Sequence, residues 1–270
     1  MIVALVPVYN EEIDIIHVLE RLIQYVDALI VVNDGSSDSS HSLITRWRAD
    51  KPNVFYLFLP VNKGMSTALL SGFKFFLRQV ERQVFSLSDA VVTIDADGQH
   101  DPQDIPPMHE FFKRNNLDVL IGRRDFTCYP YHRVIGNKIL SLFASLIGGY
   151  RFQDVECGFK ILSMSFLEDL IDYYIGFRYS CANEIGVIAG LLGYRIDNSY
   201  DVKVARYRRR GPIFFDLFLN SMCSLLVSLK IRLKRVFGKS MYRIRHFLPD
   251  NSFEFPGMKD HELNINLPNK

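Results

Sequence analysis

The first half of the chain alternates short apolar runs with longer amphipathic segments, and this alternation restricts the folds open to it. Runs rich in Val, Ile and Leu predict five strands, at Ile2–Val6, Ala28–Val32, Val54–Leu59, Ala90–Ile94 and Leu117–Ile121. Segments with helical periodicity separate them, at Ile13–Val26, from the Ser/Asp loop after Val32 to about Ala49, at Ser66–Val80 and at Ile105–Arg114. Strands separated by such helices form right-handed βαβ units. The sequence therefore predicts an α/β fold with a mostly parallel sheet, buried on both faces.

The second half of the chain is less regular. Helices are predicted at Arg133–Ile147 and Ala182–Leu192, and extended segments at Gly158–Leu162 and Tyr194–Val204. The 270 residues suffice for one large domain with appendages. We expect one domain over residues 1–212 and a separate segment over residues 213–245. The tail over residues 246–270 is rich in Asn, Pro and acidic residues, which predicts poor order.

Composition excludes several classes of protein. Apolar residues make up 48% of the chain and charged residues 23%, the balance of a globular domain that can bury a core. The N-terminus lacks the basic region of a signal peptide, and no uninterrupted apolar stretch reaches the roughly 18 residues of a spanning helix. Neither a C-x-x-C pair nor a zinc-like spacing is present, so we expect reduced thiols in a cytosolic protein at Cys128, Cys157, Cys181 and Cys223.

Basic residues are concentrated near the C-terminus. Residues 203–245 hold twelve Lys or Arg and one acidic residue, which leaves 20 basic and 29 acidic residues elsewhere. This asymmetry predicts one surface that meets an anionic partner. We expect that partner to be a membrane surface and not a nucleic acid.

Within this region, Ile213–Leu233 is apolar apart from one polar stripe at four-residue spacing, formed by Asp216, Asn220, Ser224 and Ser228. With its basic flanks, residues 213–245 are predicted to form an amphipathic segment in a membrane interface. The alternatives are a helix packed on the domain and a spanning helix, which Asp216, Asn220 and Lys230 disfavour. The interfacial interpretation predicts a cytoplasmic protein attached peripherally to the cytoplasmic face of a membrane.

Polar clusters follow each of the five predicted strands. They are Pro7–Glu12, Asn33–Asp38, Asn62–Gly64, Asp95–Pro102 and Gly122–Arg124. Parallel α/β sheets bind ligands outside the carboxyl ends of their strands, so these clusters should converge on one edge of the sheet. Their convergence predicts a site for a charged, polar ligand.

Asp95 and Asp97 are the sharpest signal among these clusters. Two carboxylates two residues apart at a strand end repel each other unless a cation lies near them. Oxygen ligands suit Mg²⁺ or Mn²⁺, which would in turn hold a diphosphate, and Gln99 could add a neutral oxygen. The alternative is a polar turn in which Asp101-Pro102 begins a helix. The preceding apolar strand and the other four clusters favour the metal site.

The remaining clusters add cations and hydrogen-bonding groups. Asp34 lies at a strand end and suits a nucleotide base or ribose, whereas Ser37 or Asp38 could simply cap a helix. Lys63 could lie in a solvated turn, but its position favours contact with a phosphate or base. Arg124 and Arg133 match the charge and geometry of a diphosphate, although they could also be surface charges.

These motifs resemble, in order and spacing, the family 2 inverting glycosyltransferases, and among them the synthases of dolichyl-phosphate mannose and of bacterial polyprenyl-phosphate hexoses. The resemblance covers about residues 1–212. It rests on VPVYNEE at 6–12, NDGSSD at 33–38, NKG at 62–64, DADGQHDP at 95–102, GRR at 122–124, QDVECGFK at 153–160 and RRRG at 208–211. Two departures are Arg123, where the family often has Ser, and the lack of the transmembrane helices into which relatives often continue.

The resemblance implies a GT-A catalytic domain over residues 1–212 and a role for each matching residue. The nucleoside would be bound by Pro7, Tyr9, Glu11 and Asp34. The nucleotide-sugar site would also include Lys63, Asp95, Ala96 and Arg208, and the metal would be held by Asp95, Asp97 and Gln99. Catalysis would involve Asp97, Asp154, Arg124 and Arg133, with Arg124, Arg133 and Arg208 around the phosphates and Asp154 near the reacting sugar.

The reaction so implied is metal-dependent transfer of a hexose from a UDP- or GDP-linked donor to undecaprenyl or dolichyl phosphate, with inversion. An ionised acceptor phosphate needs no strong general base. A sugar hydroxyl as acceptor would need one, and Asp154 or Glu184 could serve.

Three other classes of protein are disfavoured. A nucleotidyltransferase would usually carry a Gly-rich loop where this chain has Val8–Glu11. A non-catalytic membrane adaptor would not need Asp95 and Asp97. A two-carboxylate hydrolase is disfavoured because Asp95 and Asp97 are too close to flank a sugar.

Overall fold

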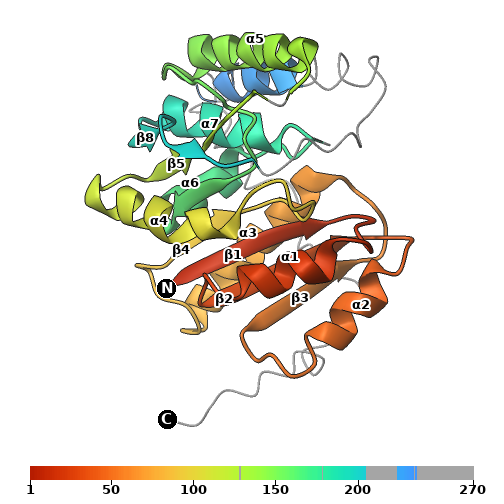
Figure 1. The fold of residues 1–270 in the computed structure, drawn as a ribbon. Coiled ribbons are helices and arrows are strands. Elements are labelled where there is room, and N and C mark those ends of the chain that lie inside the picture. The colour runs from red at the N-terminus through yellow and green to blue at the C-terminus, as the bar shows by residue number, and fades with distance from the viewer. Residues whose placement is uncertain (128, 178, 205–223, 234, 236–270) are drawn as a thin grey trace, which may run out of the picture.

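The computed structural model describes residues 1–127, 129–177, 179–204, 224–233 and 235. Its main sheet has seven strands in the order β3-β2-β1-β4-β7-β5-β8 (Figure 1). The strands are β1 (Ile2–Val8), β2 (Ala28–Asp34), β3 (Val54–Leu59), β4 (Ala90–Thr93), β5 (Val119–Ile121), β7 (Lys160–Ser163) and β8 (Ile196–Asp197). Two further strands, β6 (Arg123–Arg124) and β9 (Asp201–Val202), pair with each other.

The sheet is parallel except at β7. Strand β1 pairs in parallel with β2 on one side and β4 on the other, and β3 continues the parallel half beyond β2. Strand β7 is antiparallel to both β4 and β5. The prediction of a mostly parallel α/β sheet is therefore confirmed. All seven residues of β2 are buried, as expected of a strand that helices cover on both faces.

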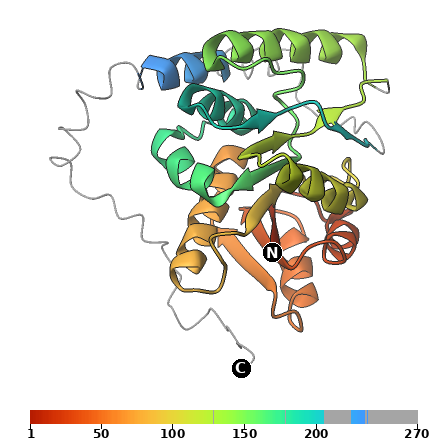
Figure 2. The same ribbon diagram turned by 90° about the vertical axis from the view of Figure 1, so that its left-hand side faces the viewer.

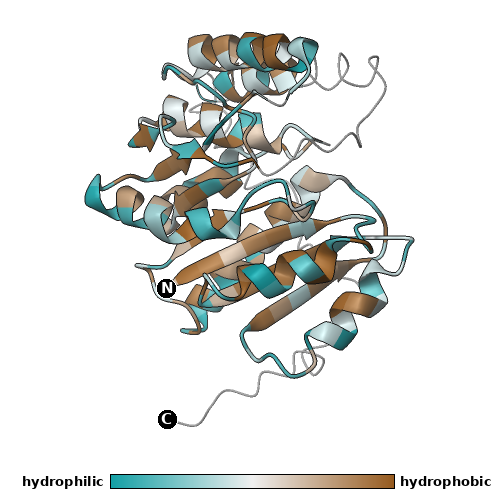
Figure 3. Ribbon diagram, viewed as in Figure 1, coloured by the Kyte–Doolittle hydropathy of each residue, from teal (hydrophilic) through white to brown (hydrophobic). Residues whose placement is uncertain are grey.

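Helices cover both faces of this sheet (Figures 1 and 2). They are α1 (Ile15–Leu22), α2 (Ser40–Trp47), α3 (Met65–Glu81), α4 (Ile105–Arg114), α5 (Tyr131–Gly148), α6 (Met164–Tyr173) and α7 (Cys181–Leu192), with a 3₁₀ turn, η1, at Pro102–Asp104. On one face α3, α6 and α7 pack against each other, and α5 lies outside α7. Figure 3 shows the apolar strands gathered at the centre of the molecule.

Helix α6 is not among the helices predicted from the sequence. It begins directly where β7 ends, because the Ser163 side chain accepts a hydrogen bond from the Phe166 backbone N–H and caps the helix. No Gly or Pro separates the strand from the helix, so the boundary carried no turn signal. The extended segment expected at Tyr194–Val204 divides into β8 and β9.

Within the C-terminal basic region, residues 205–223 and 236–270 lie outside the described residues, together with the predictions made for them. Residues 224–233 form a helix that packs on the domain through Val227 and Ile231. The Ser228 hydroxyl donates to Asn183 Oδ1 of α7 at 3.1 Å. In the described part of the chain, no helix has both the length and the apolarity needed to cross a bilayer.

Candidate active site

Asp95 and Asp97 follow β4, which lies beside β1 at the centre of the sheet. Burial and the neighbouring Asp97 carboxylate raise the pKa of Asp95 to about 7, against the opposing charges of Arg124 and Lys160. Ala96 between them is buried. A partly buried carboxylate whose charge is opposed by a second carboxylate favours a bound cation.

Gln99 supports this acidic pair. Its backbone N–H and its side-chain amide both donate to the Asp97 carboxylate, at 3.0 and 2.5 Å. Its carbonyl oxygen accepts from the Tyr129 hydroxyl at 3.2 Å. In this arrangement Gln99 orients Asp97, and its own oxygen is engaged by Tyr129.

Asp95 and Asp97 supply two of the oxygen ligands that Mg²⁺ or Mn²⁺ would need. Among the described residues, no group of three or more His, Cys, Asp or Glu side chains is arranged to hold a metal ion. Mg²⁺ is commonly held by one or two carboxylates together with substrate phosphates and water. Asp95 and Asp97 fit such a site, in which the substrate would complete the coordination.

The loops after β1 and β2 are joined by hydrogen bonds. The backbone N–H of Asn10 donates to Ser36 Oγ at 3.0 Å, and that of Glu11 donates to Ser40 Oγ at 2.9 Å. In return, the Ser37 N–H donates to Asn10 Oδ1 at 2.8 Å. Asp38 accepts from the backbone of Glu12 and Ser40, so it stabilises the loops.

These joined loops present the residues predicted to bind the nucleoside. Pro7 is buried within β1, whereas Tyr9 is exposed at its end. Tyr9 and Glu11 line an open cavity of about 490 Å³ beside Asp38. The cavity therefore lies at the carboxyl end of β1, the strand adjacent to β4.

Asp34 ties the β2 loop to the β3 loop. Its two carboxylate oxygens accept from the backbone N–H groups of Lys63 and Gly64, at 2.9 and 2.7 Å. The loops approach so closely that a Cβ at Gly35, where φ is +65°, would overlap the backbone of Val61 and Asn62. Asp34 is buried and holds Lys63, whose side chain is exposed, at the edge of the site.

Arg124 and Asp154 form a buried ion pair beside the acidic pair. The guanidinium donates to both Asp154 oxygens, at 2.7 and 2.8 Å, and the Arg124 backbone N–H donates to Oδ2 at 3.1 Å. The Asp154 carboxylate overcomes burial and raises the pKa of Arg124. Asn198 anchors the Asp154 backbone N–H at 2.8 Å. Asp154 therefore positions Arg124.

The segment that follows Asp154 packs against Asp95. A Cβ at Gly158 would overlap the Asp95 carboxylate, and the Gly158 carbonyl accepts from Thr93 Oγ1 at 2.7 Å. Lys160 is buried and donates to the carbonyl oxygens of Val155 and Cys157. Burial lowers the pKa of Lys160.

Glu156 lies in the same segment. One of its carboxylate oxygens, Oε1, is buried without a hydrogen-bond partner among the described residues. Burial raises the pKa of Glu156 to about 7, against the charges of Lys160 and Arg124.

Arg133 lies in the first turn of α5. Its Nε atom is buried and has no hydrogen-bond partner among the described residues. One turn later on the same helix, Asn137 Oδ1 accepts from Arg124 Nη2 at 3.5 Å. Helix α5 therefore begins near Arg124, and Arg133 in its first turn has one buried nitrogen without a partner among the described residues.

Glu184 and Arg208 were also considered as site residues from the sequence. Glu184, considered as a base for a hydroxyl acceptor, is fully buried and accepts from the Ile175 and Gly176 backbone and from the Ser180 hydroxyl. It stabilises the turn before α7. Arg208 lies outside the described residues, so its predicted role stays a prediction.

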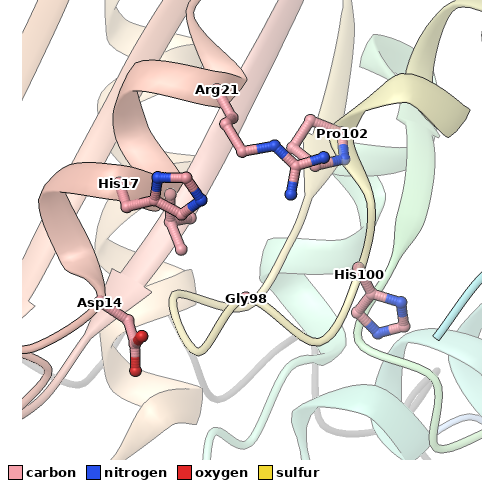
Figure 4. Close-up of a pocket in the computed structure, with 7 residues that line it drawn as sticks. Asp14, His17, Arg21, Gly98, His100 and Pro102 are labelled. Carbon is pink, nitrogen blue, oxygen red and sulfur yellow. The ribbon is translucent and has the colours of Figure 1, made fainter. Parts of the chain in front are cut away.

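A separate pocket of about 220 Å³ lies between α1 and the loop after β4 (Figure 4). Figure 4 shows His17 and Arg21 on α1 opposite Gly98, His100 and Pro102. Arg21 donates to Asp101 at 2.6 Å beside it. None of the predicted site residues lines this pocket.

Several supporting residues were missed by reasoning from the sequence alone. Tyr129, Asn137 and Asn198 hold Gln99, Arg124 and Asp154 through side-chain hydrogen bonds. They have no motif of their own, because their role depends on contacts between distant segments. Glu156 and Lys160 fall inside the matched QDVECGFK segment, where two charged residues among apolar neighbours were the available signal.

This chain is similar to known proteins in both sequence and fold. Residues 3–171 match the family described as Glycosyl transferase family 2. A UDP-N-acetylglucosamine–dolichyl-phosphate N-acetylglucosaminyltransferase from Methanococcus voltae is 29% identical over 208 residues, which cover 70% of this chain and 80% of that protein. An undecaprenyl-phosphate mannosyltransferase from Micrococcus luteus is 27% identical over 166 residues, covering 59% of this chain and 65% of the relative.

Solved structures agree at the level of the fold. Glucosyl-3-phosphoglycerate synthase from Mycobacterium tuberculosis, in complex with Mn²⁺, UDP-glucose and phosphoglyceric acid, superimposes with a TM-score of 0.60 at 18% identity. The match covers 86% of this chain and 79% of that chain. The fold is thus the GT-A fold, and the family match spans more than half of the sequence. The chain belongs to glycosyl transferase family 2 and is a glycosyltransferase.

Proposed function

We propose that this glycosyltransferase moves a hexose from a UDP- or GDP-linked donor to a polyprenyl phosphate, undecaprenyl or dolichyl, at the cytoplasmic face of a membrane. Relatives whose names specify dolichyl-phosphate or undecaprenyl-phosphate transfer support this acceptor class. Mg²⁺ or Mn²⁺ held by Asp95 and Asp97 would neutralise the donor diphosphate. Tyr9, Glu11 and Lys63 line the edge where the nucleotide would lie.

The observation that carries this proposal is the engagement of Asp154 by Arg124. A sugar hydroxyl needs a carboxylate base, but both Asp154 oxygens are occupied by a guanidinium. An acceptor phosphate is already ionised and needs no base. Arg124 and Arg133 supply the positive charge that two phosphate groups in one site require.

The reaction then follows from these positions. An oxygen of the acceptor phosphate attacks the anomeric carbon on the face opposite the diphosphate. The bond from that carbon to the diphosphate breaks, and the nucleoside diphosphate leaves with the electron pair. Arg124, fixed by Asp154, stabilises the negative charge that develops on the leaving group, because a preorganised donor needs no reorganisation in the transition state.

A second candidate, transfer to a sugar hydroxyl, is favoured by Glu156. A carboxyl group whose pKa is about 7 and whose buried oxygen has no partner among the described residues suits a general base at neutral pH. The two candidates differ in what the Glu156→Gln variant does. It should abolish transfer to a hydroxyl and leave transfer to a phosphate largely intact.

The test is a panel of nucleotide sugars assayed with a short polyprenyl phosphate and with an unphosphorylated glycan in direct competition. Wild type should prefer the phosphate, and chelator should abolish turnover until Mg²⁺ or Mn²⁺ is restored. Asp97→Asn should lower turnover by about 100-fold or more with an unchanged fold. Full activity in chelator would remove the metal from the proposal, and preference for the glycan would remove the lipid phosphate.

A further inference from the structure

Helix α5 is amphipathic in the reverse sense to an ordinary surface helix. The residues that it buries are small or polar: Asn137, Ser141, Ala144 and Gly148. Apart from His132 and Lys138, the residues that it exposes are large and apolar: Tyr131, Ile135, Ile139, Leu142, Phe143 and Leu146. At 100° per residue the exposed side chains fall within an arc of about 120°. A surface helix normally turns such a stripe toward the core.

The helix at residues 224–233 extends this apolar surface. It buries Val227 and Ile231 and exposes three leucines at helical spacing, Leu226, Leu229 and Leu233. Arg232 Nη1 donates to the Leu146 carbonyl oxygen of α5 at 3.1 Å, which joins the two helices. Figures 1 and 2 show both helices in one layer at the end of the molecule away from β3. We call the nine exposed side chains on these helices the outer apolar face.

The charge around the outer apolar face has one sign. Neither Tyr131–Gly148 nor residues 224–235 contain an Asp or Glu. Lys138, Lys230 and Arg232 are exposed on these two helices, and Arg235 is exposed close to the second one in sequence. Figure 3 shows apolar residues along α5, interrupted by few hydrophilic ones. An apolar stripe with cations and without acids complements the interface of an anionic bilayer, where each cation contributes on the order of 1 kcal/mol.

We propose that the outer apolar face is the surface on which this protein lies against an anionic lipid bilayer, with α5 in the plane of the interface. Exposed leucine, isoleucine and aromatic side chains would enter the boundary between headgroups and acyl chains, and the lysines and arginines would meet lipid phosphates. This inference deepens the proposed function and rests on it for the identity of the acceptor.

The position of α5 gives this orientation a consequence for the site. The first turns of the helix carry Arg133 and Asn137, and Asn137 contacts Arg124. If α5 lies on the bilayer, the arginines of the site are therefore brought to the level of the lipid headgroups. A lipid phosphate could reach Arg133 while its hydrocarbon chain stays in the membrane.

The test is flotation of the full chain on vesicles of phosphatidylcholine with about one third phosphatidylglycerol. The face variant is Leu142→Glu with Leu146→Glu, at positions 59% and 64% exposed. The matched control is Phe58→Glu with Leu87→Glu, at positions 41% and 72% exposed elsewhere on the molecule. Wild type and control should float, and the face variant should bind at least about tenfold more weakly, since two apolar anchors are replaced by charges that anionic lipid repels.

Thermal unfolding and binding of a nucleoside diphosphate, measured without lipid, show whether each variant is folded. If wild type and face variant float equally, the outer apolar face is not the membrane surface. If wild type stays off the vesicles and light scattering finds a dimer that the face variant loses, the face joins two copies of the chain. Failed flotation with intact nucleotide-sugar binding would overturn this inference alone, whereas failed donor binding would count against the proposed function.

Discussion

Two arginines that are adjacent in the sequence occupy opposite environments. Arg123 donates to both oxygens of Asp201, whose side chain is 72% exposed, at 2.6 and 2.7 Å. Arg124 makes the same bidentate contact with Asp154, which is completely buried. Asp154→Ala should therefore lower the free energy of unfolding by about 3–5 kcal/mol, because it leaves a buried guanidinium without its counter-charge. Asp201→Ala is the matched control and should cost about 0–1 kcal/mol.

Urea unfolding of both variants checks this prediction. Equal losses would mean that Arg124 reaches solvent when Asp154 is removed, and the site would then be more open than its geometry indicates.

His100 makes stability depend on pH. Burial and the charges of Arg124 and Lys160 lower its pKa to about 3, from 6.5 in the unfolded chain. Below about pH 6.5 the unfolded chain gains a proton that the folded protein cannot take. The contribution of His100 to the free energy of unfolding is thus fully present above pH 6.5 and is lost progressively as the pH falls toward 3.

The His100→Gln variant should lose less stability than wild type as the pH falls. Urea unfolding midpoints at pH 8, 6 and 4.5 measure this difference. His109, whose pKa is lowered to about 4 chiefly by burial, contributes with the same sign, so the single variant retains part of the slope. Wild type and His100→Gln profiles that run parallel would contradict the burial of the neutral imidazole.

At the scale of elements, the packing of α5 on α7 depends on glycine. A Cβ at Gly190 of α7 would overlap the carbonyl oxygen of Gly148 in α5, and a backbone atom cannot move aside as a side chain can. Gly190→Ala should therefore push the helices apart and lower the free energy of unfolding by about 1–3 kcal/mol. Gly136→Ala, in α5, meets nothing within 4 Å and should instead stabilise by up to about 1 kcal/mol.

Thermal unfolding of the two glycine variants distinguishes them, because their expected shifts have opposite signs. A neutral Gly190→Ala variant would show that the two helices adjust to each other. The outer apolar face would then be less rigidly held than their close approach indicates.

At the scale of the whole molecule, the site joins segments that are far apart in the chain. A nucleoside diphosphate that contacts the β1 loop and, through a divalent cation, Asp95 and Asp97 must stabilise the whole fold. UDP or GDP together with Mn²⁺ should raise the melting temperature more than the separate additions do. At 100-fold above Kd the gain is about 2.7 kcal/mol, or several degrees for a chain of this size.

The nucleotide that gives the larger shift identifies the donor base. Asp97→Asn should retain the small shift from nucleotide alone and lose the added shift with Mn²⁺. If the nucleotide shifts the melting temperature equally with chelator and with Mn²⁺, nucleotide binding does not depend on a cation at the acidic pair.

The parallel half of the molecule could be predicted from the sequence because its signals are local. Strand and helix periods differ, so β1 to β5 and the helices between them follow from the spacing of apolar residues. Asp95, Asp97 and the loops at the strand ends are equally local, since a parallel sheet brings those ends together whatever lies between. The antiparallel β7 was predicted as a strand, but its direction depends on the path of the chain.

The tertiary structure alone decided which groups are engaged and which are free to act. Asp154 matches a family motif, but only its contact with Arg124, 30 residues away, assigns it to positioning. Glu184 has a plausible charge for a base, and only its backbone partners assign it to a buried turn. The periodicity of α5 predicted an apolar helix, yet a period cannot tell which side faces the domain. The elements that α5 packs on decide which side is buried. Here its small and polar residues face the domain and its large apolar residues face outward.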